Sequence, residues 1–206
     1  MTRIKICGIT TAEDAADAVE AGADALGFIF VPDTPRAISP EAAERIVGTL
    51  PPFIAAVGVF VDQPVREVLN IAARCCLHAV QLHGEEPPEA ARLIPLKVIK
   101  AIRVKDAESL RPLGTYPAHA FLLDAFVEGK PGGTGRVLPW ELAAQVKGPA
   151  RIILSGGLRP ENVDQAVRLV RPYGVDVSSG VEMRPGRKDR QKVREFIAAV
   201  RRADQS

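Results

Sequence analysis

The sequence lacks the residue patterns by which disulfide-stabilised and metal-binding proteins are recognised. Its three cysteines are an odd number, and the adjacent pair Cys75-Cys76 has the spacing of neither a redox motif nor a zinc site. The three histidines, His78, His83 and His119, stand apart from one another and from carboxylates at ligand spacing. We therefore expect neither a disulfide framework nor a bound metal.

Long apolar runs and an excess of charge of one sign are also missing. No segment is apolar over the length needed to cross a membrane, and the first residues lack the apolar core of a signal peptide. The 27 basic and 25 acidic residues give a net charge of +2 and are scattered along the chain, so no basic surface for nucleic acid is expected. These absences predict a cytoplasmic protein that binds neither nucleic acid nor membranes.

What the sequence does contain is a repeated alternation of strand-like and helix-like segments. Short runs rich in Val, Ile, Leu and Phe recur roughly every 25 residues, and each precedes a segment with helical spacing, which is typical of a parallel sheet. No linker or low-complexity segment divides residues 1–206, so we expect one domain. The expected strands are Arg3–Cys7, Ala25–Phe30, Ala55–Phe60, Ala79–Leu82, Lys97–Ile102, Ala120–Asp124, Arg151–Ser155 and Val175–Ser178.

Two architectures fit a parallel sheet of this kind. Strands that are apolar on both faces, such as Ile152-Ile153-Leu154, suit a sheet buried between a packed interior and an outer ring of helices. An open doubly wound sheet is the alternative, but the first strand is followed by Gly8-Ile9-Thr10 and not by the glycine-rich turn of a dinucleotide site. The pattern therefore favours the α/β class, as a single (β/α)8 TIM barrel with short loops.

Several helix ends carry their own signals. Thr10 with Glu13 predicts a capping box, and Ser39 before Pro40 predicts an N-cap followed by proline in the first turn. Gly22 suits the left-handed turn that ends a helix. These signals mark both ends of the first expected helix and the start of the second.

In a barrel of this kind, functional groups gather at the carboxyl ends of the strands. Cys7 ends the first expected strand, where a thiolate near helix N-termini would have a lowered pKa and could act as a base or nucleophile. A buried, inert thiol is the alternative. Asp124 ends the sixth strand, where a carboxyl group could act as a general acid, unless it only caps the following loop. Both residues are candidates for proton transfer.

Other strand ends carry groups suited to anions. Ser155-Gly156-Gly157 and Ser178-Ser179-Gly180 follow the last two strands, where barrels commonly build a phosphate site from backbone amides and a short helix. The loop at 128–135 is dense in glycine, which suits an active-site loop, part of a phosphate cradle or a plain surface loop. Arg36, after the second strand, could grip a carboxylate or lie solvated on the surface. The turns predict a phosphate-bearing substrate.

Seven motifs occur in order from the first strand to the last. They are Lys5-Ile6-Cys7-Gly8-Ile9-Thr10, Thr34-Pro35-Arg36 with Ser39-Pro40-Glu41, Val57-Gly58-Val59-Phe60, Val80-Gln81-Leu82-His83-Gly84, Gly132-Gly133-Thr134-Gly135, Leu154-Ser155-Gly156-Gly157-Leu158 and Val177-Ser178-Ser179-Gly180-Val181-Glu182. Together they resemble the phosphoribosylanthranilate isomerase family over nearly the whole chain. One such motif is weak by itself, whereas the ordered set is specific.

The resemblance implies an aldose–ketose isomerase that needs no cofactor. Its members convert N-(5-phosphoribosyl)anthranilate, a phosphosugar, to 1-(2-carboxyphenylamino)-1-deoxyribulose 5-phosphate by an Amadori rearrangement in tryptophan biosynthesis. The resemblance implies Cys7 as the general base, Asp124 as the general acid and Arg36 as the residue that holds the anthranilate carboxylate. The turns at Gly156-Gly157 and Ser178-Ser179-Gly180 match the phosphate site. Some members are dimers, so a homodimer is also an expectation for this chain.

Two departures from the family pattern flank the glycine-rich loop. Ala125 stands where the family more often has a hydroxyl residue, and Leu138-Pro139-Trp140 replaces Phe-Asp-Trp, which leaves the details of this loop open. Other phosphosugar barrels are the competing interpretation. The related histidine-pathway isomerase is expected to have a carboxylate where Cys7 stands, and pentose-phosphate epimerases need metal ligands that this sequence does not assemble. A silent ligand-binding barrel would lack the acid or the base, and both are present.

Overall fold

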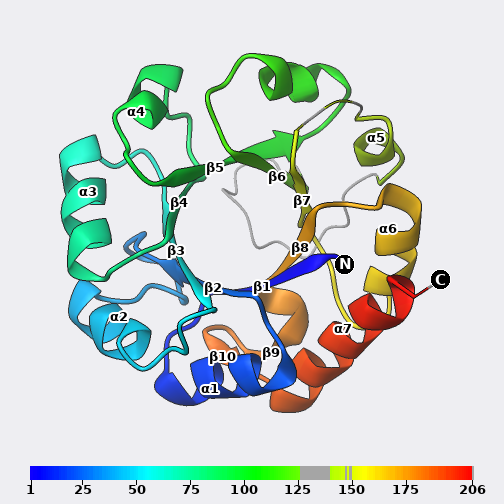
Figure 1. The fold of residues 1–206 in the computed structure, drawn as a ribbon, viewed down its shortest axis with the longest axis horizontal. Coiled ribbons are helices and arrows are strands. Elements are labelled where there is room, and N and C mark those ends of the chain that lie inside the picture. Colours follow the sequence, from blue (N-terminus) through cyan, green and yellow to red (C-terminus); the bar gives the residue numbers. More distant parts are fainter. Residues whose placement is uncertain (126–139, 147, 149, 206) are drawn as a thin grey trace.

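Strands and helices alternate along the chain in the order that the sequence predicts. The computed structural model describes residues 1–125, 140–146, 148 and 150–205. Within these residues, eight parallel strands pair in sequence order and β1 also pairs with β8, so the sheet closes into a barrel (Figure 1). The strands are β1 (Arg3–Cys7), β2 (Ala25–Ile29), β3 (Ala55–Phe60), β4 (Ala79–Leu82), β5 (Lys97–Val104), β6 (Ala120–Ala125), β7 (Ile152–Leu154) and β8 (Gly174–Val177). The predicted TIM barrel is confirmed.

The helices form a ring around this barrel (Figure 1). They are α1 (Ala12–Ala21), α2 (Pro40–Val47), α3 (Val65–Arg74), α4 (Pro88–Arg92), α5 (Trp140–Ala144), α6 (Val163–Val170) and α7 (Arg190–Ala203). Between β5 and β6 the chain forms a 3₁₀ helix, η1 (Glu108–Gly114), with Pro112 inside it. Proline disfavours a regular α-helix because it has no N–H and its ring clashes with the preceding turn. No helix in the described ranges is long and apolar enough to cross a membrane.

A short hairpin follows the last barrel strand. After β8 the chain forms the 3₁₀ turn η2 (Ser179–Val181) and then the antiparallel strands β9 (Glu182–Arg184) and β10 (Arg187–Lys188) before α7 begins. The sequence pattern did not predict this hairpin, because strands of two or three residues give no periodicity to read. It lies beside α1 in Figure 1 and contributes to the site described below.

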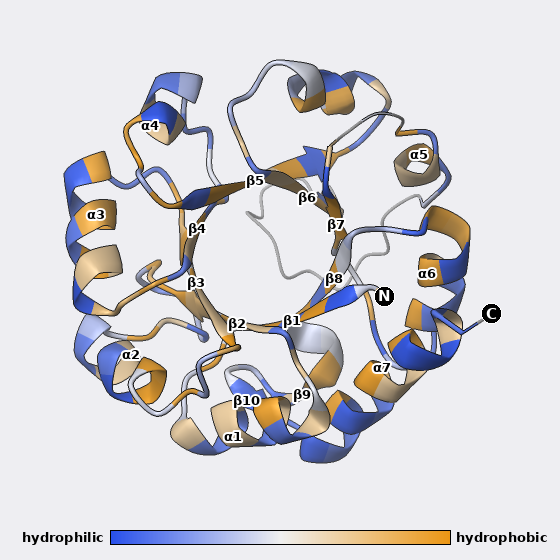
Figure 2. Ribbon diagram, viewed as in Figure 1, coloured by the Kyte–Doolittle hydropathy of each residue, from blue (hydrophilic) through white to orange (hydrophobic). Residues whose placement is uncertain are grey.

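Successive strand residues face opposite sides of the sheet, so the barrel has an outer and an inner core. On the outside, residues such as Ile4, Ile6 and Leu154 pack with helix residues such as Phe196 in one large buried cluster. The helices in Figure 2 are correspondingly mixed, with hydrophobic and hydrophilic residues alternating along each one. The interior holds a smaller cluster of Val57, Ala79, Ile99, Ala101, Ala120, Leu122 and Ile153.

The helix-end signals are confirmed at two places and wrong at one. The Ser39 side chain accepts a hydrogen bond from the Ala42 amide with Pro40 at the helix start, and Gly22 has a φ of 101°. The first helix, however, is capped by Thr11, whose side chain accepts from the Asp14 amide, and not by Thr10. The Thr10 hydroxyl instead donates to the carbonyl of Gly186 at 2.6 Å, in the turn of the β9–β10 hairpin. A long-range partner therefore replaces the local one.

The two ends of the described chain meet at the amino ends of the strands. The backbone N–H and the hydroxyl of Thr2 donate to the Asp204 carboxylate at 2.8 and 2.6 Å. Arg201, one turn earlier on α7, donates to the Thr2 carbonyl at 2.7 Å. These bonds fasten α7 to the strand that closes the barrel.

Candidate active site

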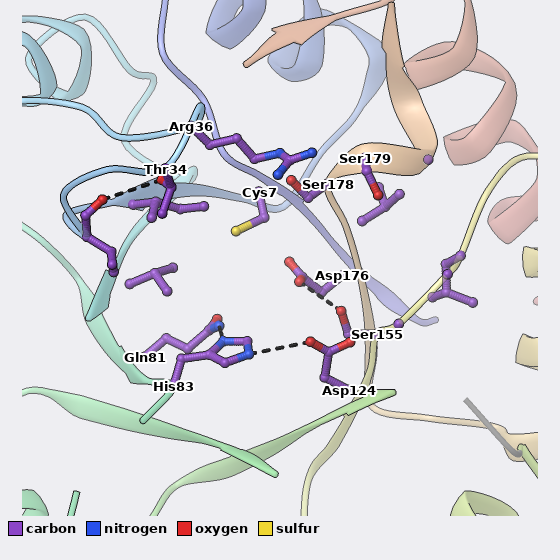
Figure 3. Close-up of a pocket in the computed structure, with 18 of the residues that line it drawn as sticks. Cys7, Thr34, Arg36, Gln81, His83, Asp124, Ser155, Asp176, Ser178 and Ser179 are labelled. Carbon is purple, nitrogen blue, oxygen red and sulfur yellow. Dashed lines mark hydrogen bonds and ion pairs between the residues drawn. The ribbon is translucent and has the colours of Figure 1, made fainter. Parts of the chain in front are cut away.

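One pocket at the carboxyl ends of the strands is lined by eight residues that the sequence predicts for the site. They are Cys7, Arg36, Asp124, Gly156, Gly157, Ser178, Ser179 and Gly180. They come from β1, β6, the loop after β2 and the turns after β7 and β8. In Figure 3 the sulfur of Cys7 lies between Arg36 and Ser178 on one side and His83 and Asp124 on the other. The fold therefore gathers groups that are as much as 173 residues apart in sequence, from Cys7 to Gly180.

Cys7 points into the barrel because it lies on the inward-facing side of β1. The neighbouring strand has Gly27 opposite it, and a Cβ there would come within 2.6 Å of the Cys7 sulfur. The thiol thus occupies space that any other residue at 27 would fill. Burial raises the pKa of Cys7, although the ammonium groups of Lys5 and Lys188 act in the opposite direction. The expectation of a lowered pKa is wrong, because desolvation disfavours the thiolate more than the nearby cations favour it.

Asp124 stands at the carboxyl end of β6 with two contacts that orient its carboxyl group. Its Oδ1 accepts from the amide of Ala125 at 2.8 Å, and its Oδ2 lies 3.4 Å from Nε2 of His83 on the facing strand end (Figure 3). Gly156, with a φ of 76°, passes so close that a Cβ would meet the Ala125 amide at 2.5 Å and the Asp124 Oδ1 at 2.9 Å. A side chain at position 156 would therefore displace the Asp124 carboxyl group.

Arg36 is held in the pocket wall by the hairpin that follows β8. Its Nε and Nη2 both donate to the Glu182 carboxylate at 2.8 Å, and Lys188 donates to the same carboxylate at 3.0 Å. Burial acts against ionisation of Glu182, but these two cations hold its pKa below the usual range. Within the described part of the chain, the third guanidinium nitrogen of Arg36 donates to no residue. Arg36 is thus a fixed wall residue, and the alternative of a solvated surface arginine is wrong.

The two turns expected to hold a phosphate face the same pocket. Gly156 and Gly157 both have positive φ, at 76° and 67°, and their amides donate no hydrogen bond to another described residue. The hydroxyl of Ser178 is buried without a partner in the described ranges. Gly180 packs so tightly that a Cβ would come within 1.9 Å of the Leu158 carbonyl. The site therefore offers several donors and brings the turns after β7 and β8 together.

Several pocket residues were not predicted from the sequence. In sequence, His83 stands apart from carboxylates, yet in the fold it contacts Asp124. Gln81 and Asp176 also line the pocket. A usable signal exists for two of them, since Gln81 and His83 are two residues apart at the end of β4 and so point the same way. The ion pairs that Glu182 makes with Arg36 and Lys188 could not be predicted, because they depend on the hairpin that the sequence pattern did not show.

The glycine-rich loop and a metal site are the remaining features that the sequence analysis considered. The glycine-rich loop at 128–135, with Leu138-Pro139, lies outside the described residues. Among the residues that are described, no group of three or more His, Cys, Asp or Glu side chains is arranged to hold a metal ion.

Comparisons with known proteins agree on one family. The family model of N-(5'phosphoribosyl)anthranilate (PRA) isomerase matches residues 4–199. An N-(5'-phosphoribosyl)anthranilate isomerase of Geobacter sp. (strain M21) is 56% identical over 202 residues, which cover 98% of this chain and 99% of that relative.

Two solved structures are similar over nearly their whole length. A phosphoribosyl anthranilate isomerase in complex with reduced 1-(o-carboxyphenylamino)-1-deoxyribulose 5-phosphate is 45% identical, with a TM-score of 0.86, and the match covers 98% of this chain and 99% of that one. A structure of monomers made from the dimeric isomerase of Thermotoga maritima is 42% identical, with the same TM-score and the same coverage.

Proposed function

The chain belongs to the N-(5'-phosphoribosyl)anthranilate isomerase family, and we propose that its pocket carries out the Amadori rearrangement of N-(5-phosphoribosyl)anthranilate with Cys7 as base and Asp124 as acid. The product is 1-(2-carboxyphenylamino)-1-deoxyribulose 5-phosphate. We further propose that residues 1–206 act as one catalytic domain, without a cofactor, in cytoplasmic tryptophan biosynthesis.

The proposed reaction needs one proton donor and one proton acceptor. The Asp124 carboxyl group gives its proton to the ribose ring oxygen, and the C1–O bond breaks to leave a protonated Schiff base between C1 and the anthranilate nitrogen. The Cys7 thiolate then removes the proton from C2, and the electron pair moves to form an enolamine. Protonation at C1 and loss of the proton on the C2 hydroxyl give the ketose. Net, one hydrogen moves from C2 to C1 through Cys7 and one proton moves from the C2 hydroxyl to the former ring oxygen through Asp124, so both groups are restored and no redox partner is required.

The observation that carries this proposal is that a thiol and a carboxyl group line one pocket together with an arginine and two turns rich in glycine and serine. Arg36 offers a cation for the anthranilate carboxylate, and the turns after β7 and β8 offer amides for the phosphate. The test is turnover of phosphoribosylanthranilate by the purified protein, followed by the loss of anthranilate-type fluorescence. A protein that binds the substrate but leaves its fluorescence unchanged would contradict the proposed activity.

Replacing Arg36 by methionine is expected to raise KM by about 10- to 100-fold and to leave kcat much less affected. A charge-assisted contact is worth roughly 1.5–3 kcal/mol, and the substrate carboxylate keeps its charge throughout the reaction, so the contact is lost equally from the bound substrate and from the transition state. Steady-state kinetics with phosphoribosylanthranilate measure both constants. Arg74→Met is the control, because Arg74 is likewise an ion-paired arginine, bound to Glu41 and Glu44, but lies outside the pocket. An unchanged KM in Arg36→Met would remove Arg36 from substrate binding.

Activity is expected to be the same in EDTA as in divalent cations, because fixed amides can hold a phosphate without a metal. Substrate without its phosphate should have a kcat/KM lower by about 10-fold or more, since remote binding energy helps to position the reacting carbon. Inorganic phosphate should inhibit competitively. Loss of turnover in EDTA, with recovery on adding a divalent ion, would contradict the amide site and favour a metal-dependent barrel.

A homodimer in solution is also proposed, and Phe53 is the residue on which it is tested. Its side chain is 95% exposed in the loop between α2 and β3, the most exposed of the large apolar side chains among the described residues. Light scattering of the wild type should give twice the chain mass of 22.1 kDa, and Phe53→Ser should lower it towards the monomer. Leu93→Ser, at another exposed apolar residue, should leave the mass unchanged. A wild-type mass of 22.1 kDa at micromolar concentration would contradict the dimer.

A further inference from the structure

A buried ammonium group lies inside the barrel beside the proposed base. Nζ of Lys5 donates to Asp176 Oδ1 at 2.7 Å and to Gln81 Oε1 at 3.0 Å, and the Lys5 and Asp176 side chains are only 6% and 7% exposed. The other side of the Asp176 carboxylate accepts from Ser155 at 3.2 Å (Figure 3). Neither Lys5 nor Gln81 takes part in the proton transfers proposed above.

The hydrogen bond from Lys5 to Gln81 determines how the next side chains in a series of contacts are oriented. The series runs from Lys5 through Gln81 and His83 to Asp124. An ammonium group can only donate, so Gln81 presents its oxygen to Lys5 and its amide nitrogen to His83. That nitrogen lies 2.8 Å from His83 Nδ1, which must therefore accept. The ring proton of His83 is then on Nε2, which lies 3.4 Å from Asp124 Oδ2 but makes no hydrogen bond to a described residue. The position of one lysine thus decides whether the His83 nitrogen that faces Asp124 carries the ring proton.

Lys5 also lies next to Cys7, because residues two apart on a strand share a face. A Cβ built on Gly27 would contact both, at 2.6 Å from the Cys7 sulfur and 3.1 Å from Lys5 Cε, so the two side chains flank one small space. The charged groups around this space are Lys5 on β1, Asp176 on β8 and Lys188 on β10. Burial would lower the pKa of Lys5, but Asp176 and Cys7 raise it above its usual value, so Lys5 remains an ammonium.

We propose that Lys5 is a positioning residue for both ends of the reaction: it favours the thiolate of Cys7 directly and orients Asp124 through Gln81 and His83. The proposal rests on the proposed function, in which Cys7 is the base and Asp124 the acid. It explains why a charge is buried here at all. The rest of the barrel interior is filled by Ala, Val, Ile and Leu, and a buried ion pair adds little stability compared with such residues.

The first test measures the ionisation of Cys7 without any substrate. Alkylation by iodoacetamide is followed against pH and located by peptide mass spectrometry, with the exposed Cys76 as an internal reference. In Lys5→Met the midpoint for Cys7 should move up by roughly one to three pH units, because the nearest cation is lost while Asp176 remains. The midpoint for Cys76 should stay where it is. An unchanged Cys7 midpoint in a folded Lys5→Met protein would overturn the direct part of the proposal.

Lys100→Met is the matched control for removing a buried lysine. Lys100 is 10% exposed and bonded to Glu86 at 2.7 Å, much as Lys5 is bonded to Asp176, but it does not line the pocket. It should lower the melting temperature as Lys5→Met does and leave the Cys7 midpoint unchanged. An equal shift in both variants would mean that the effect is structural and would contradict a positioning role.

The second test uses Gln81→Met, which keeps the Lys5–Asp176 ion pair and so serves even if Lys5→Met does not fold. NMR of protein with ¹⁵N-labelled histidine should show the Nε2–H form of His83 in the wild type and a mixture of forms in Gln81→Met. The variant should lose kcat by about 10-fold or more with KM little changed, because a misoriented acid affects the chemical step. A wild-type His83 protonated on Nδ1, or an unchanged kcat, would overturn the indirect part.

These readouts separate the inference from the proposed function. Thiol ionisation and histidine protonation are measured without turnover, so they test Lys5 and Gln81 whether or not Cys7 is the base. If Cys7→Ser kept its activity while Lys5→Met shifted the Cys7 midpoint, the proposed function would fail and the electrostatic role of Lys5 would stand.

Discussion

Replacing Cys7 by serine is expected to lower kcat by roughly 100- to 10,000-fold, the range in which a general base contributes. Serine is almost the same size as cysteine, but its hydroxyl is far less acidic, so it can supply very little of the anion needed to remove the C2 proton. The fold should be kept, because the side chain fills the same space opposite Gly27. Turnover and circular dichroism on the same sample separate loss of chemistry from loss of structure.

The chain provides a matched control in Cys75. This thiol is also buried and free, but it lies at the end of α3 with its sulfur 3.4 Å from the Pro40 carbonyl, away from the pocket. Cys75→Ser should leave kcat unchanged. A Cys7→Ser enzyme that kept more than about a tenth of the wild-type rate would exclude Cys7 as the base.

The dependence of the wild-type kcat/KM on pH should reflect the ionisation of the Cys7 thiol. Because burial raises the pKa of Cys7, the base form becomes more populated as pH increases through that raised value. The kcat/KM of the free enzyme should therefore increase with pH on its acidic side, with the midpoint above that of an ordinary exposed thiol. A profile flat across this range would count against Cys7 titrating as the base.

Asp124→Asn should lower kcat by a similar factor, and this is the second large effect. Asparagine has the same shape and can still accept a hydrogen bond from the Ala125 amide, but it has no acidic proton to give to the ribose ring oxygen. The Schiff base should then fail to form, so the variant should bind substrate with nearly normal affinity and leave it unopened. Single-turnover fluorescence measures the ring-opening step directly.

Asp24→Asn is the control for this variant. Asp24 precedes β2 at the opposite end of the barrel, where it binds Arg3 and Arg201. Its replacement should lower the melting temperature and leave turnover unchanged. If Asp124→Asn turned over within about ten-fold of the wild type, proton donation by Asp124 would be excluded.

Most of the barrel could be predicted from the sequence because its determinants are local. Each strand is a short apolar run followed by helical spacing, and the described strand bounds differ from the predicted ones by no more than two residues at either end. Cys7 and Asp124 could be found for the same reason, since each is the polar residue that ends such a run. The hydrophobic pattern and the position in the chain are enough to predict a segment wherever its sequence neighbours determine its structure.

Three of the features that were missed depend on contacts between distant parts of the chain. Thr10 was expected to cap a helix and instead binds Gly186, which is 176 residues away. The pKa of Cys7 depends on how deeply the closed barrel buries it, and Arg36 is fixed by Glu182 from the hairpin after β8. Residue spacing cannot show such partners, because the barrel brings them together only when it closes.

The contact between Thr2 and Asp204 has a consequence for how the chain could be rearranged. Both ends of the described chain lie at the amino ends of the strands, whereas the pocket opens at the carboxyl ends. A short flexible linker could therefore join residue 204 to residue 2, and the chain could be opened at another loop on the amino side without moving a pocket residue. The same geometry would let another domain be fused at either end while the entrance to the pocket stays clear.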